Sequence, residues 1–259
     1  MLGLNTLRHR QSEQLGYEDV VAEEYPVALV YNGISHAVMM VTPTDLELFA
    51  IGFSLSEGIV GSRREIYGIE VLRHAEGAEL QIEIAQSAFV KLKAHRRTLV
   101  GRTGCGVCGT ESLQLLDLQP ERVSAVMAEK PDSQAISRIF AALPAHQPLM
   151  RATGCVHAAA WCTPHGDIIK VFEDVGRHNA MDKLLGWQAK QMIDPGAGLI
   201  FLTSRASYEL VRKAARCDVR ILATVSAPTA LAVRIAHAAG IQLLSFCRDN
   251  GFVAYPPSN

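Results

Sequence analysis

The feature that most constrains the fold of this chain is the regular alternation of short apolar runs with helical patterns in its second half. The runs at 199–203, 219–225 and 241–246 have the length of strands, and the patterns at 177–192, 208–217 and 228–240 have the length of helices. Strands and helices that alternate at this spacing are typical of a parallel sheet covered by helices on both faces. The chain therefore predicts an α/β fold, a three-layer sandwich around a largely parallel sheet.

The first half of the chain is predicted to be β-rich. The stretches 25–31 and 34–41 flank Asn32-Gly33, the dipeptide favoured in a two-residue hairpin turn. A second hairpin is expected from 66–74 and 79–84, turning at Glu76-Gly77.

Between these strands and the second half, the sequence predicts two helices and a third hairpin. The helices are expected at 45–57 and 133–143, and the hairpin pairs 158–162 with 168–174. We expect a β-rich N-terminal part over residues 1–130 and an α/β domain over residues 131–259.

Composition indicates a soluble globular protein. Among 259 residues, 49% are hydrophobic and the net charge is −1, which gives no support for non-specific binding to nucleic acid. We find no signal-peptide pattern at the N-terminus and no apolar run of the roughly 18 residues that a membrane span needs. The expected location is cytoplasmic, with neither nucleic acid nor membrane as a partner.

The run of residues 101–109 contains two cysteines, Cys105 and Cys108, separated and flanked by glycines. Such a pair can form a redox disulfide, hold half of a metal site or carry a sulfur atom. A structural zinc site needs four ligands, and the other four cysteines are isolated in the sequence, so no metal site is predicted. The glycines disfavour the helix on which a thioredoxin-like pair would lie.

Sulfur carriage fits the same residues. A persulfide on one cysteine has to move between a donor and an acceptor, which a glycine-rich loop permits, and the second thiol can release the sulfur by exchange. Arg102 would stabilise a thiolate or perthiolate. The spacing alone leaves a zinc site, a redox pair and a turn with incidental cysteines open as alternatives.

Four ordered segments resemble the FdhD family, and the resemblance extends over about residues 18–255. The segments are residues 101–109, Arg151–Ala159, Glu173–Lys183 and Ser226–Thr229. The resemblance implies a sulfurtransferase that a cysteine desulfurase loads with sulfur. The sulfur then passes to the molybdenum of the bis(molybdopterin guanine dinucleotide) cofactor before that cofactor enters formate dehydrogenase. It also implies that Cys105 bears the persulfide and that Cys108 is its partner.

The resemblance further implies a cofactor-binding segment and a scaffold. The segment would comprise Phe246, Cys247, Arg248, Asp249, Asn250 and Gly251. The family's fold is similar to that of the cytidine deaminases, whose catalytic glutamate and zinc-binding cysteines form H-x-E and P-C-x-x-C elements. Here Ala180 stands at the glutamate position and residues 204–209 contain no cysteine, so deamination is not expected.

Three strand-to-helix turns are candidate anion-binding sites for the phosphates of such a cofactor, because helix N-termini and strand ends gather anionic ligands. The candidate residues in these turns are Arg177, His178, Ser204, Arg205 and Ser226. Helix capping is the alternative role for Ser226, a buried structural role the alternative for His157 and His178, and an ion pair the alternative for Asp174.

Two further expectations concern assembly and function. The long extended N-terminal half suggests a homodimer. A non-catalytic chaperone that binds and delivers the molybdenum cofactor is the alternative to the sulfurtransferase.

Overall fold

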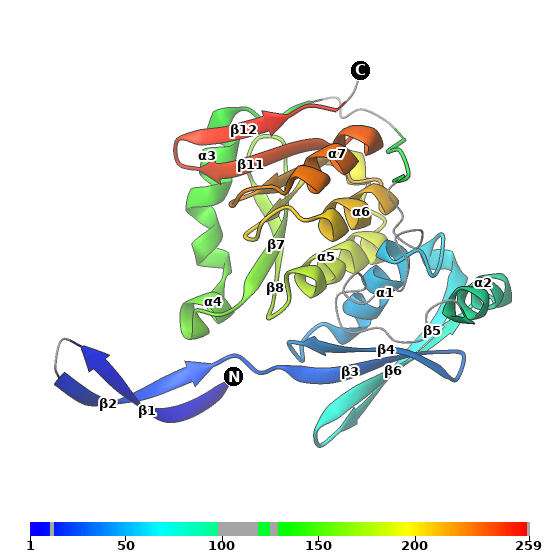
Figure 1. The fold of residues 1–259 in the computed structure, drawn as a ribbon, viewed down its shortest axis with the longest axis horizontal. Helices are drawn as coiled ribbons and strands as arrows, with labels where there is room; N and C mark the ends of the chain where they lie inside the picture. The colour runs from blue at the N-terminus through cyan, green and yellow to red at the C-terminus, as the bar shows by residue number, and fades with distance from the viewer. Residues whose placement is uncertain (11–12, 98–118, 125–128, 258–259) are drawn as a thin grey trace.

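The computed structural model describes residues 1–10, 13–97, 119–124 and 129–257. Two sheets form the body, and helices lie on both faces of the larger one (Figure 1). The predicted mixed α/β class with a β-rich N-terminal part is confirmed. The predicted division at residue 130 stays a prediction.

The larger sheet has six strands within the described residues, in the order β12-β11-β10-β9-β7-β8. These strands are β7 (His157–Cys162), β8 (Ile168–Asp174), β9 (Leu199–Leu202), β10 (Ile221–Thr224), β11 (Gln242–Arg248) and β12 (Gly251–Tyr255). Only β9, β10 and β11 pair in parallel among them, so the expectation of a largely parallel sheet is wrong. Short turns join β7 to β8 and β11 to β12, and strands joined by such turns have to run antiparallel.

The helices cover both faces of this sheet, as the three-layer prediction requires. One face is covered by α3 (Ser133–Ala142), and the other by α5 (Arg177–Gln191), α6 (Tyr208–Arg216) and α7 (Ala230–Ala239). Side chains alternate between the layers along β9, as expected for a strand buried on both faces. Phe201 packs with Ile136 and Ile139 of α3, whereas Leu202 packs in the core formed with the other three helices.

The smaller sheet has the strand order β4-β3-β6-β5. Its strands are β3 (Tyr25–Tyr31), β4 (Ile34–Val41), β5 (Ile66–His74) and β6 (Gly77–Ile84), which confirms both predicted hairpins. The second hairpin turns at Ala75-Glu76, one residue before the predicted Glu76-Gly77, because Gly77 already pairs with His74. Asn32 and Gly33 have φ values of 45° and 81°, the left-handed conformation that a tight hairpin turn requires. One face of the sheet packs on α1 (Leu46–Ser56), with Phe49 of that helix fully buried.

The two parts of the body meet where α1 crosses α5. At this crossing a Cβ atom on Gly52 would lie 1.7 Å from the carbonyl oxygen of Asp182, and one on Gly186 would lie 1.9 Å from that of Leu48. Two glycines therefore bring the helix backbones into direct contact, closer than side chains allow.

Several elements were not predicted from the sequence. They are β1 (Leu2–Arg10), β2 (Glu13–Val21), α2 (Gln86–Arg97), α4 (Pro148–Thr153) and the strand β12. The β1–β2 hairpin extends away from the body as an arm (Figure 1). Short 3-10 turns occur at Arg63–Glu65, Leu143–His146 and Pro195–Ala197. Across the part of the chain described, we find no helix both long and apolar enough to span a membrane.

Candidate functional site

The predicted turns meet along one edge of the larger sheet, which we call the strand-end edge. The backbone N–H of Val225 donates to the carbonyl of Leu202 at 3.0 Å, and that of Phe246 donates to Ser226 at 3.4 Å. Because β7 and β8 are antiparallel, His157 at the start of β7 pairs with Asp174 at the end of β8 on this same edge. The turns after β8, β9 and β10 and the middle of β11 therefore lie side by side.

The helix α5 begins at this edge with an arginine and a histidine in its first turn. Gly176 precedes this turn and has no side chain to cap it, its own N–H donates to Asp174 Oδ1 at 2.9 Å, and Arg177 and His178 are half-buried. Burial, followed by the charges of Arg177 and His178, lowers the pKa of His157, which favours the neutral form of this imidazole. Uncapped N–H groups at a helix N-terminus beside an arginine are suited to binding an anion.

An acidic residue that the sequence analysis missed lies beside His178. Glu209, in the first turn of α6, has its Oε2 3.9 Å from His178 Nε2, an ion-pair distance rather than a hydrogen bond. His178 is the largest influence that lowers the pKa of this carboxyl, to about 2. The position of Glu209 in a first helical turn could have indicated it, because acidic residues are favoured there.

The two predicted residues in the turn after β9, Ser204 and Arg205, differ in their exposure to solvent. Ser204 is buried, and its hydroxyl donates to the carbonyl of Arg205 at 3.1 Å, so it stabilises the turn. The side chain of Arg205 is exposed and available to a ligand on this edge.

The turn after β10 shows that Ser226 does not cap α7. The cap is Thr229, whose Oγ1 accepts from the N–H of Ala232 at 3.2 Å. Ser226 instead accepts at its carbonyl from Thr224 Oγ1, at 3.1 Å, while its side chain is half-buried. The capping alternative for Ser226 is therefore wrong.

Phe246 lies on the strand-end edge in an unusual conformation. Its φ is 57°, and the pairing of β11 with β12 shifts register between Ser245 and Arg248. An irregularity of this kind turns a side chain away from its regular direction. The ring of Phe246 is 42% exposed although the neighbouring Ser245 is fully buried. An exposed aromatic ring beside cationic turns can stack on a planar base.

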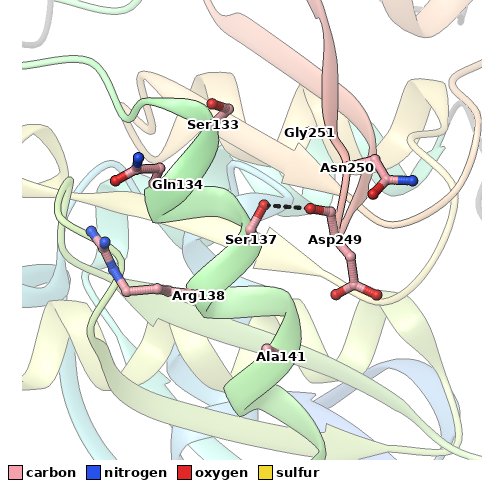
Figure 2. A pocket seen from close by; sticks show the side chains of 8 residues that line it. All are labelled: Ser133, Gln134, Ser137, Arg138, Ala141, Asp249, Asn250 and Gly251. Atoms are coloured by element: carbon pink, nitrogen blue, oxygen red, sulfur yellow. Dashed lines mark hydrogen bonds between the residues drawn. The ribbon is translucent and has the colours of Figure 1, made fainter.

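The rest of the predicted segment 246–251 divides into a buried thiol and a groove. Cys247 is fully buried in the core under α3, and burial raises its pKa to about 12, so its side chain is not available to a ligand. Arg248 is exposed. The turn that follows faces α3 across a groove of about 570 Å³ (Figure 2). Its lining residues are Ser133, Gln134, Ser137, Arg138, Ala141, Asp249, Asn250 and Gly251.

A single hydrogen bond ties the two walls of this groove. Ser137 Oγ of α3 donates to the carbonyl of Asp249 at 3.0 Å, drawn as a dashed line in Figure 2. The guanidinium of Arg138 binds the carbonyl of His165, so its charge is directed away from the β11–β12 turn. Among the polar groups that line the groove are the carboxylate of Asp249 and the amides of Asn250 and Gln134.

Cys105 and Cys108 lie outside the described residues. The chain is described again just after them, at residues 119–124, where it is attached to the C-terminal ends of α6 and α7. Glu121 pairs with Arg216 Nε at 3.1 Å, and the N–H of Val123 donates to Ala239 at 2.9 Å. Since each helix returns across the sheet, these contacts lie at the edge opposite the strand-end edge.

One exposed thiol lies beside the site. Cys155, just before β7, is exposed and is not part of a disulfide among the described cysteines. Within the described ranges, no three His, Cys, Asp or Glu side chains gather to hold a metal ion.

Comparison with known proteins gives a consistent set of relatives. A family model described as the FdhD/NarQ family matches residues 22–259. A protein named sulfur carrier protein FdhD from Chromobacterium violaceum is 58% identical over 256 residues, covering 98% of this chain and 95% of that protein. A relative of the same name from Burkholderia cenocepacia is 57% identical over 244 residues, covering 92% and 87%.

A solved structure gives independent support for the fold. It is described as a formate dehydrogenase accessory protein from Desulfotalea psychrophila, and it superposes with a TM-score of 0.72 at 22% identity. The match covers 98% of this chain and 96% of that one.

Proposed function

The chain belongs to the FdhD/NarQ family, and we propose that it is a sulfur carrier that serves the maturation of formate dehydrogenase. The observation that carries this proposal is the 58% identity, over nearly the whole chain, to a protein named sulfur carrier protein FdhD. The name of the structural relative, a formate dehydrogenase accessory protein, agrees with the same role.

Sulfur would enter and leave through the pair Cys105 and Cys108. The Cys105 thiolate attacks the terminal sulfur of a persulfide on a cysteine desulfurase, and the donor cysteine leaves as a thiolate. The Cys108 thiolate then attacks the Cys105 sulfur, which forms a disulfide and releases hydrosulfide to the acceptor. A thiol reductant restores both thiols for the next cycle.

The acceptor would be the molybdenum of bis(molybdopterin guanine dinucleotide), bound as a substrate at the strand-end edge. Arg177 and Arg205 supply positive charge and donors for its phosphates, His178 supplies a ring nitrogen, and Phe246 supplies a ring for a guanine base. Ser226 would contribute from the turn between them.

Not every residue of the predicted cofactor site contributes a side chain in this proposal. The Ser204 hydroxyl is engaged within its own turn, and the Cys247 thiol is buried. Arg248, Asp249, Asn250 and Gly251 would extend the site from the edge toward the α3 groove.

A homodimer in the cytoplasm, acting with the desulfurase and formate dehydrogenase, completes the proposal. The β1–β2 arm is the element we expect to contact a second copy, because it extends beyond the body (Figure 1). Neither nucleic acid nor membrane is proposed as a partner.

The test is sulfur loading followed by intact-mass measurement. After incubation with a cysteine desulfurase and cysteine, the wild-type protein should gain the mass of sulfur, and Cys105→Ala should not. Cys155→Ala, which removes an exposed thiol outside the pair, is the matched control and should load normally. Loading of Cys105→Ala, together with normal formate dehydrogenase activity in cells, would contradict the assignment.

The non-catalytic chaperone is the second candidate, favoured only by the cationic strand-end edge. It predicts that a variant lacking both Cys105 and Cys108 still supports formate dehydrogenase in cells and still binds guanosine diphosphate. Loss of activity with nucleotide binding retained supports the sulfur carrier.

A further inference from the structure

Asp174, at the end of β8, is fully buried; it accepts three hydrogen bonds and forms one ion pair with described residues. Its Oδ1 accepts from the N–H of Gly176 and from Asn179 Nδ2, both at 2.9 Å. Its Oδ2 accepts from the N–H of Thr42 at 3.0 Å and pairs with Lys183 Nζ at 2.7 Å. One carboxylate therefore ties the start of α5 to the loop at Thr42, two segments that are distant in sequence.

The two oxygens face different parts of the molecule. Oδ1 binds the turn that starts α5, between β8 and Arg177, whereas Oδ2 binds the loop that leads from β4 to α1. The partners are themselves cross-linked, because Lys183 Nζ also donates to the carbonyl of Thr42 at 2.9 Å. The Thr42 hydroxyl accepts in turn from the N–H of Val175 at 3.1 Å.

The chemistry of this cluster requires a carboxylate. All four groups that contact Asp174 are donors, and an ionised carboxylate offers acceptor sites on both oxygens. An asparagine at this position would present an NH₂ group to two of these donors. The turn is also tightly packed, since a Cβ atom on Gly176 would lie 2.6 Å from Asn179 Nδ2.

We propose that Asp174 is a positioning residue, which holds the turn of Gly176, Arg177 and His178 in the conformation that binds the phosphates of a guanine nucleotide. This inference rests on the proposed function, because it assumes that the strand-end edge binds such a ligand. The same carboxylate also accepts from the N–H of Thr42, so it fixes the turn to the loop that follows the N-terminal sheet.

A second buried pair in the same region provides a matched control. Asp182 and Lys213 are 1% and 3% exposed, and Lys213 Nζ contacts both carboxylate oxygens at 2.9 Å. Asp182 lies on α5, and its other side-chain partner is Ser56 at the end of α1. It makes no side-chain contact with the turn at the start of α5 among the described residues. Loss of either pair should lower stability, but only loss of Asp174 should release the turn.

The experiment compares Asp174→Asn with Asp182→Asn in the full-length protein. Both should unfold at lower temperature than the wild type. Titration of guanosine diphosphate, at a temperature where circular dichroism shows folded protein, should give about tenfold weaker binding for Asp174→Asn alone, roughly the effect of losing charge-assisted hydrogen bonds. Hydrogen exchange of the amides at 175–179 should also be faster in Asp174→Asn than in Asp182→Asn.

Thr42→Val covers the case in which Asp174→Asn does not fold. This substitution keeps the Asp174 carboxylate and nearly the same side-chain volume at residue 42, but it removes the hydroxyl that accepts from the N–H of Val175. It should weaken nucleotide binding several-fold. Equal loss of affinity in the two Asp→Asn variants, or unchanged affinity in Asp174→Asn and Thr42→Val, overturns the positioning role. If the wild-type protein itself does not bind guanosine diphosphate, the ligand assignment of the proposed function fails, and the phosphate role of the turn fails with it.

Discussion

Lys213 of α6 lies 2.7 Å from the carboxylate of Glu57, the residue that directly follows α1. The ammonium also binds Asp182 and Ser56, so a single buried cation joins α1, α5 and α6. Burial alone would raise the pKa of Glu57, but Lys213, Arg212 and Arg216 outweigh burial and lower it to about 2.

This pair should make the protein sensitive to acid. Since the pKa of Glu57 is about 2 in the folded protein and 4.5 ordinarily, the unfolded chain takes up the proton first as the pH falls. The contribution of Glu57 to stability is therefore complete above about pH 4.5 and is lost toward pH 2. Urea denaturation should show Glu57→Gln to be less stable by about 2 kcal/mol at pH 7, with the difference shrinking below pH 4.5. A difference that stays constant with pH would contradict this origin.

The glycine crossing of α1 and α5 should not tolerate side chains. Gly52→Ala is expected to lower the free energy of unfolding by about 3 kcal/mol or more, because its methyl group would meet the backbone of Asp182. Gly61→Ala is the matched control, since a Cβ atom there would meet only Glu65 Oε2 at 3.4 Å. Denaturant titration of both variants measures the difference, and similar losses in the two would count against the crossing.

Phe246 should contribute to nucleotide binding without stabilising the fold. Phe246→Gly removes the exposed ring and places at φ 57° the residue that best tolerates this angle. We expect unchanged or higher thermal stability and about tenfold weaker binding of guanosine diphosphate, the effect of one lost stacking contact. Val253→Ala, at an exposed position on β12, should leave binding unchanged.

Arg177 should contribute a charge to the strand-end edge. Arg177→Gln is expected to weaken binding of guanosine diphosphate and to make the remaining affinity less dependent on salt. Arg64→Gln changes the same charge on the exposed 3-10 turn Arg63–Glu65 and should have neither effect. Isothermal titration at two salt concentrations tests both variants, and an equal response would show a non-specific charge effect.

Cysteine reactivity should follow burial. Of the four described cysteines, only Cys155 is exposed, and burial raises the pKa of Cys162, Cys217 and Cys247. Iodoacetamide at pH 8 should therefore label Cys155 rapidly, the half-buried Cys217 slowly, and Cys162 and Cys247 only after unfolding. Peptide mass spectrometry reads out each site, and rapid labelling of Cys217 or Cys247 in the native protein would contradict their placement.

Local patterns in the sequence predicted much of the fold. The Asn32-Gly33 turn identified its hairpin with the observed strand limits, since two residues of this type allow few other conformations. Most predicted helices begin and end within about two residues of their observed limits, because apolar periodicity and glycine stops are local signals. The candidate residues of three turns were likewise named from the sequence, and Phe246 was named from the family resemblance; the structure places these turns and Phe246 along one edge.

The parts that were not predicted depend on contacts between distant segments. In the sequence, Gly52 and Gly186 are recognisable only as residues that weaken a helix. Their role at the crossing of α1 and α5 becomes visible only in the folded structure. The sequence suggested an ion pair for Asp174. It did not reveal the hydrogen bond from the N–H of Thr42, because this bond joins the end of a strand in one sheet to the loop that follows the other sheet. The mixed sheet was missed because strand alternation does not reveal which neighbour a strand pairs with.

The contact between Gly52 and Gly186 also limits how this protein can be recombined with its relatives. A chimera that takes α1 from one parent and α5 from another would combine two helix surfaces that were not selected together. Any residue larger than glycine at either position would then press against the backbone of the other parent's helix. A functional crossover between α1 and α5 therefore has to leave glycine at both positions.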